Sequence, residues 1–331
     1  TPAPLPLTLL AAAGAGTGIW FAATAIARRL PAPLPRALPA DPHLDGALGL
    51  LREGYTYIGQ TCDRLGTDGF RTRIAGLPAL CLRGREAVDV FYTPGLFTRQ
   101  GALPSSATRL LQDHGSVATL DDHAHHHRKA MFLDVLAPAR LEALVSAATR
   151  EWAHARRRWR GLAQVPLQTE VRRLLCRAVC EWAGVPLRDA DVDRRTGDFA
   201  SMIDNAARLG PPNWIATRRR QDTERWVGGL VDQVRRGDYV PPRDSALHAI
   251  ALHRDEHGAL LPVDVATVEL LNILRPVVAV GSFIAFAAIA LHQHPKWQER
   301  LAVPTVSDDV VRAFVHEVRR RGNRTSLVLD D

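Results

Sequence analysis

An arginine and a proline lie side by side in a long apolar segment, and they are the residues that most clearly suggest chemistry. Between Glu269 and His292 the only charged residue is Arg275, and Pro276 follows it directly. Burial of an unpaired guanidinium is very costly, so Arg275 needs an anionic partner. The partner is either an Asp or Glu of the protein or the carboxylate of a ligand, and the residue types favour neither. Pro276 has no backbone N–H, so we expect it to kink the helix there.

A run of acids and histidines, DDHAHHHRK at residues 121–129, is the second candidate for chemistry. His123 and His127 are one helical turn apart, a spacing that suits zinc or iron ligands. No H-E-x-x-H pattern is present, and no carboxylate lies at ligand spacing on the same face. The sequence therefore favours a helix N-terminus whose basic side chains point at an anionic group over a metal site.

Glu317 and Arg320 form the pattern E-x-x-R. Taken alone, this pattern is an i,i+3 ion pair worth only about 0.3 kcal/mol when exposed. Its position after the histidine-rich segment and the apolar segment with Arg275 is what makes it informative.

The elements that must position these residues are mostly helices. A 3.6-residue apolar stripe runs through residues 171–182, and residues 189–207, 215–236 and 243–254 also have helical patterns. Residues 276–291 suit a helix through the core of a large α protein. Residues 70–84 predict a β-hairpin that turns around Gly76, Leu77 and Pro78, and a short helix follows. The last helix is expected to begin after Ser307.

Composition limits the classes of function. The chain has 331 residues, of which 46% are hydrophobic, and a net charge of +7 that comes almost entirely from arginine. Arginine clusters at residues 155–160 and 217–221 have helical patterns, so we interpret them as exposed helix faces rather than nucleic-acid contacts. The four cysteines suit buried free thiols rather than disulfides or a zinc site. They are Cys62, Cys81, Cys176 and Cys180.

The chain divides into three parts by composition. Residues 1–30 contain an uncharged stretch, residues 5–27, that is followed by two arginines. This pattern predicts a membrane anchor with a cytoplasmic domain after it; a secretory signal and a segment that is not part of the mature protein are the alternatives. Residues 31–42 are a proline-rich linker. Residues 43–331 are expected to form one globular domain.

These motifs, in this order, resemble the cytochrome P-450 superfamily, and within it the branch of hydrogen-peroxide-dependent fatty-acid peroxygenases. The resemblance covers nearly all of residues 44–320. It rests on LLREGYTYI, FTRQGALP, HAHHHRKAMF, CRAVCEWAGVPL, ELLNILRPVVAV, ALHQHPKW and FVHEVRR. The resemblance implies a mainly α P-450 fold with a small N-terminal β-hairpin region, and a heme b cofactor.

The resemblance also implies roles for single residues. Arg275, with Pro276 beside it, would bind the carboxylate of a long-chain fatty acid. Gln100 would lie above the heme, where glutamine rather than histidine favours hydroxylation over decarboxylation. The remaining implied roles are heme-propionate binding by His125 and Lys129, lining of the acyl channel by Ile203, Ala206 and Ala207, and bracing of the fold by Glu317 and Arg320.

The implied reaction is hydroxylation of a fatty acid by hydrogen peroxide. Ordinary members of the superfamily carry an acid–alcohol pair in this helix, whereas this chain has Arg275 and Pro276 near that place. A substrate carboxylate held by Arg275 would act as the general acid–base, so no reductase is needed.

The sequence departs from the family pattern in one respect. The family holds its heme iron with a cysteine in a glycine-rich loop after E-x-x-R. Only the eleven residues RGNRTSLVLDD follow Arg320, and no cysteine of the chain lies in such a loop. We therefore expect a C-terminally truncated P-450 domain without its proximal ligand. The alternative function is a catalytically inactive protein that at most binds fatty acid.

Overall fold

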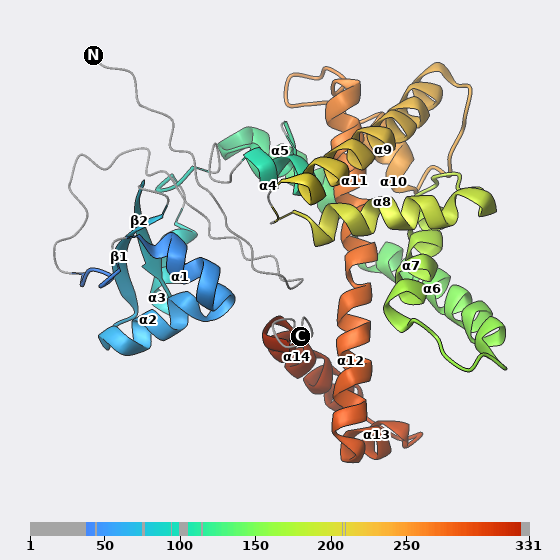
Figure 1. Ribbon diagram of the computed structural model, residues 1–331. Coiled ribbons are helices and arrows are strands. Elements are labelled where there is room, and N and C mark those ends of the chain that lie inside the picture. The colour runs from blue at the N-terminus through green and yellow to red at the C-terminus, as the bar shows by residue number, and fades with distance from the viewer. Residues whose placement is uncertain are drawn as a thin grey trace.

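The computed structural model describes residues 38–325, with gaps at residues 44, 75–76, 94, 99–104, 114, 207 and 209. The membrane anchor expected at residues 1–30 lies outside the described residues. The first described part is a small lobe built around two antiparallel strands (Figure 1). Its elements are α1 (Gly46–Glu53), α2 (Tyr57–Leu65), β1 (Gly69–Ile74), β2 (Leu77–Leu82) and α3 (Arg85–Phe91).

The hairpin expected within residues 70–84 is confirmed. Its register runs from Gly69 opposite Leu82 to Ile74 opposite Leu77. Leu77 and Pro78 belong to β2 rather than to the turn, which is possible for Pro78 because a two-stranded hairpin leaves one edge of each strand unpaired. Side chains from α2 and both strands form the core of this lobe: Tyr57, Cys62, Phe70 and Cys81.

The rest of the described chain is helical, as the sequence predicts. Its α-helices are α4 (Ser105–Leu111), α5 (Asp122–Val135), α6 (Pro138–Trp159), α7 (Leu167–Trp182), α8 (Val192–Asp204), α9 (Pro211–Arg236), α10 (Ala246–Ala251), α11 (Val263–Ala279), α12 (Gly281–Gln293), α13 (Pro295–Ala302) and α14 (Asp308–Thr325). Short 3-10 helices span Gly54–Thr56, Val117–Thr119 and Asp189–Asp191.

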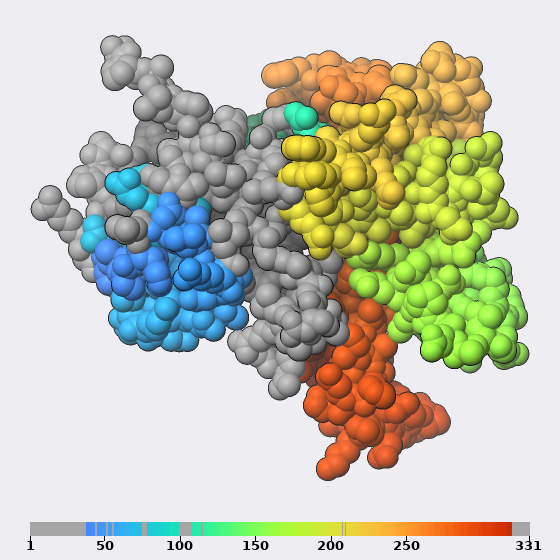
Figure 2. All heavy atoms as spheres, viewed as in Figure 1, coloured from blue at the N-terminus to red at the C-terminus, as the bar shows by residue number. Residues whose placement is uncertain are grey.

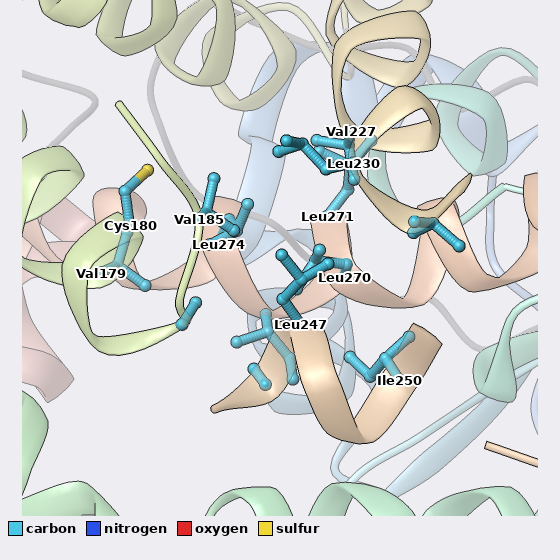
Figure 3. Packing of buried hydrophobic residues seen from close by; sticks show 14 of the residues in the cluster. Val179, Cys180, Val185, Val227, Leu230, Leu247, Ile250, Leu270, Leu271 and Leu274 are labelled. Atoms are coloured by element: carbon cyan, nitrogen blue, oxygen red, sulfur yellow. The ribbon is translucent and has the colours of Figure 1, made fainter. Parts of the chain in front are cut away.

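Helix α11 is the centre of the larger lobe. Helices α7, α8, α9 and α10 pack against it (Figure 1). Leu270, Leu271 and Leu274 of α11 are fully buried and belong to the same core cluster as Val227 of α9 and Leu247 of α10 (Figure 3). This packing places the residue after Leu274, which is Arg275, inside the protein.

The helix does not stop at its proline. Helix α11 continues through Pro276 to Ala279, and the helical pattern is interrupted at Val280, four residues after the proline at which the sequence predicts a kink. Pro276 has no N–H to bond the preceding turn, and the amide of Val280 is shared between the carbonyl oxygens of Pro276 and Val277 at 3.2 Å each.

Helices α11 and α12 differ in burial. Together they form Val263–Gln293, the one helix of the described residues that is long and apolar enough to cross a membrane by length and composition. Most of α11 is buried, whereas only Gly281, Ser282 and Phe286 are buried in α12. The expectation of a core helix at residues 276–291 is therefore wrong for most of that range, because burial is concentrated in α11 before Pro276. Helix α12 packs on α7, α13 and α14 and extends away from the helices around α11 (Figure 2).

A candidate anion-binding site around Arg275

Arg275 is a buried cation held by neutral groups. Its side chain is 7% exposed. The Nη1 atom donates to the carbonyl oxygen of Leu110 at 2.8 Å, and Nη2 donates to Oδ1 of Asn272 at 3.4 Å. Burial, together with the charge of Arg220, lowers the pKa of Arg275 to about 9, so the side chain is still cationic at neutral pH.

No carboxylate pairs with Arg275 within the part of the chain that the structure describes. Among the residues outside that part, only Asp330 and Asp331 are acidic. The sequence alone leaves an internal acid and a ligand carboxylate as equal alternatives for the partner of Arg275. These contacts favour the ligand, because a desolvated cation without an anion is costly.

Arg220 lies beside Arg275 and was not expected there. The pattern at residues 217–221 predicts an exposed helix face, which is right for Arg218 and Arg219 and wrong for Arg220. Arg220 is 1% exposed, and its Nη1 donates to the carbonyl oxygen of Leu110 at 2.9 Å. Its charge is balanced by Glu224 at 2.6 Å and Asp113 at 3.5 Å.

A signal for the burial of Arg220 is present in the sequence. The buried residues of α9 recur every three or four positions along one face of the helix, and Arg220 occupies one of these positions. They are Asn213, Ala216, Arg220, Thr223, Val227, Leu230, Val231 and Val234.

Two cavities open between α4 and α9 near Arg220. The smaller has a volume of about 300 Å³ and is lined by Arg109, Asp113, Thr217, Arg220, Gln221 and Glu224. The larger, of about 620 Å³, is lined by Arg109, Asn213, Trp214, Ile215, Thr217, Arg218 and Gln221. Arg275 lines neither cavity.

Ala206, one of the residues predicted to line an acyl channel, lies close to this site. It is 3% exposed and packs in one cluster with Leu110, Leu111 and Ala216. Leu110 therefore contacts both residues: its side chain packs with Ala206, and its carbonyl oxygen accepts the hydrogen bond from Arg275. Ile203 lies half-buried on α8. Ala207 and Gln100 lie outside the described residues.

The histidine-rich segment forms the first turns of α5. His125 is half-buried and Lys129 is exposed one turn later on the same face. The rings of His123 and His127 stack with centroids 6.5 Å apart, and Nε2 of His127 lies 2.9 Å from the carbonyl oxygen of Arg254. No group of three metal-ligating side chains occurs among the described residues.

A second buried network joins α5 to α11. Glu269 is fully buried, and its carboxylate accepts hydrogen bonds from Arg128 at 2.8 Å and from the amide of Val117 at 2.7 Å. Asn272 donates to Glu269 at 3.4 Å and accepts from Arg275. Neither Arg128 nor Asn272 stands out in the sequence, since Arg128 lies in a basic run and Asn272 is a single neutral residue three positions before Arg275.

Glu317 and Arg320 both lie on α14, three residues apart. Glu317 is half-buried. The side chain of Arg320 lies outside the described part, so the bracing role of the pair stays a prediction.

No family model matches the chain. Solved structures do resemble it. Cytochrome P450SP alpha (CYP152B1), solved with (R)-ibuprofen, is 36% identical with a TM-score of 0.80 over 83% of this chain and 67% of that one. The chain belongs to the cytochrome P450 superfamily, in its fatty-acid peroxygenase branch.

Two further members of this P450 branch agree with the assignment. Cytochrome P450EX alpha (CYP152N1), solved with myristic acid, is 35% identical with a TM-score of 0.80 and is aligned over 86% of this chain and 68% of its own. A variant of cytochrome P450 OleT, solved with arachidonic acid, is 27% identical with a TM-score of 0.81 over the same shares. The chain thus spans about two thirds of the length of these P450s.

Proposed function

We propose that this protein hydroxylates long-chain fatty acids with hydrogen peroxide in a heme-dependent reaction, and that Arg275 holds the substrate carboxylate. The observation that carries the proposal is a buried cation with no carboxylate partner among the described residues. A fatty acid would bring one carboxylate to the cation and an apolar chain to the surrounding helices. Relatives solved with myristic and arachidonic acid support this class of ligand.

The carboxylate held by Arg275 would also handle protons. Helix α11 has no acidic residue between Arg275 and its C-terminal end, so in this proposal the ligand brings the acid–base group. It would take a proton from hydrogen peroxide and return one to the departing oxygen. One peroxide oxygen enters the substrate C–H bond and the other leaves as water, so the reaction needs no reductase.

Heme would supply the oxidising chemistry, and the chain fits it in part. His125 and Lys129, one turn apart on α5, offer basic side chains for the propionates. The four cysteines do not fit the role of thiolate ligand, because all are buried in α2, β2 and α7 rather than in a loop.

The position of these cysteines favours a second candidate function. A chain that keeps the Arg275 site without a thiolate ligand would bind fatty acid without oxidising it. Attachment to a membrane through residues 1–30, and the roles of Gln100 and Ala207, stay predictions in either case.

Heme reconstitution and ligand binding separate the two candidates. We expect tetradecanoate to bind the purified protein, and Arg275→Ala to weaken binding about a hundredfold, because the desolvated ion pair is lost. Arg218→Ala is the matched control, since Arg218 is exposed on α9. A ferrous–CO complex with the red-shifted band of thiolate ligation, with product formed from peroxide, supports the enzyme. Binding without heme uptake supports the second candidate, and equal binding by Arg275→Ala would contradict both.

A further inference from the structure

The acid closest to Arg275 along α11 is kept in a separate ion pair. Glu269 precedes Arg275 by six residues and is fully buried. Arg128, which comes from α5, holds one oxygen of the Glu269 carboxylate at 2.8 Å. Burial raises the pKa of Glu269, while Arg128 acts in the opposite direction and favours the ionised form.

One neutral side chain separates this ion pair from Arg275. The amide nitrogen of Asn272 donates to Glu269 at 3.4 Å and to the carbonyl oxygen of Gln112 at 3.2 Å. Its amide oxygen accepts from Arg275 at 3.4 Å. If Arg128 were absent, Glu269 would be a buried carboxylate without a cation, and Asn272 would connect it to Arg275, a buried cation without an anion.

We propose that Arg128 is a positioning residue, which holds Glu269 so that this acid does not pair with Arg275 and Arg275 stays free for the carboxylate of a ligand. The inference rests on the proposed function, since it concerns the same site. It assigns to α5 a role in ligand selection that is separate from any contact with heme. Asn272 completes the arrangement, because it contacts both Glu269 and Arg275 without carrying charge.

The test compares two ligands of equal length, tetradecanoate and tetradecan-1-ol, on the full chain by calorimetry. In Arg128→Gln we expect affinity for tetradecanoate to fall about tenfold or more, because Glu269 turns to Arg275, while affinity for the alcohol changes less than about twofold. In Arg128→Gln/Glu269→Gln we expect tetradecanoate affinity to recover to within about threefold of the wild type. Equal weakening of both ligands, or no recovery in the double variant, would overturn the inference.

A third variant keeps the test decisive if Arg128→Gln does not fold, which circular dichroism would show. Asn272→Asp places a carboxylate that no other cation holds one hydrogen bond from Arg275. We expect the affinity for tetradecanoate to fall about tenfold and the affinity for the alcohol to stay unchanged. Unchanged tetradecanoate binding would overturn the inference.

The same measurements distinguish failure of this inference from failure of the proposed function. If wild-type binding depends on Arg275 but Arg128→Gln and Asn272→Asp show no selective loss, only this inference fails. If the wild type does not bind tetradecanoate, or Arg275→Ala binds it equally, the proposed function fails with it.

Discussion

Arg220 and Arg275 donate hydrogen bonds to the same atom, the carbonyl oxygen of Leu110, at 2.9 and 2.8 Å. Two guanidinium groups are thus held side by side in the interior. They differ in charge balance, because Arg220 contacts Glu224 and Asp113, whereas Arg275 has no such partner in the described part of the chain. The charge of Arg220 is therefore balanced within the described fold, and the charge of Arg275 is not.

Replacing Arg275 by methionine should not destabilise the ligand-free protein. The change removes a desolvated, unpaired cation and leaves an unbranched apolar side chain in its place, while Leu110 keeps its bond from Arg220. We expect the free energy of unfolding to stay the same or to rise by about 1–2 kcal/mol. Urea denaturation measures it, and a loss of more than about 2 kcal/mol would show that Arg275 is a structural residue.

Replacing Arg220 by methionine should have the opposite effect. Glu224 and Asp113 would lose their buried cation. We expect the free energy of unfolding to fall by about 3 kcal/mol. Arg218→Met on the same helix is the control, and because its side chain is exposed we expect a change within about 0.5 kcal/mol. Equal effects of the two substitutions would contradict the compensating role of Arg220.

The sequence predicted the scaffold of this site better than its contacts. Apolar periodicity identified the helices, and an isolated charge identified Arg275. The partner of Arg275 could not be predicted, because the acceptor at 2.8 Å is a main-chain oxygen, which leaves no trace in residue type. Arg220 and Arg128 both lie in basic runs. The place of Arg220 on the periodic face of α9 was a signal for its burial, whereas the ion pair of Arg128 with Glu269 left none. For α12, the apolar pattern predicted burial that the described neighbours provide only in part.

Asp41 should make the stability of the small lobe depend on pH. Burial favours the neutral acid, but hydrogen bonds from Tyr57, His43 and Thr72 outweigh it and hold the pKa of Asp41 below its usual value. A carboxyl group with a lowered pKa contributes stability above its unfolded value and loses it as the pH falls through its folded value. We expect Asp41→Asn to cost about 1–2 kcal/mol at pH 7.

That cost should shrink as the pH falls below 3.8, the ordinary value for this group. Hydrogen exchange of the β1 amides follows the local stability, because Asp41 bonds to Thr72 and to the backbone of Arg71. A cost that does not change with pH would contradict the ionised state of Asp41.

Gly184 should be irreplaceable at the end of α7. Its φ of +71° lies in the left-handed region, and a Cβ atom there would meet Oγ of Ser245 at 2.6 Å. We expect Gly184→Ala to lower the free energy of unfolding by about 2 kcal/mol or more. Gly229→Ala is the matched control: no atom lies within 4 Å of its added Cβ, so this helical change should stabilise the protein by about 0.5–1 kcal/mol. Thermal unfolding of both variants checks the contrast.

The carbonyl group of Leu110 has a consequence for mutational scanning. Its oxygen anchors two arginines whatever side chain residue 110 carries, so a survey of side-chain substitutions would report only the packing of this position against Ala206 and Ala216. Chemical synthesis reaches the atom itself. An ester in place of the peptide bond between residues 110 and 111 weakens the carbonyl as an acceptor, removes the N–H of Leu111 and changes no side chain. Compared with an ester one residue later, which keeps the Leu110 carbonyl as an amide, it would show how far a single backbone oxygen sets the direction in which a buried cation points.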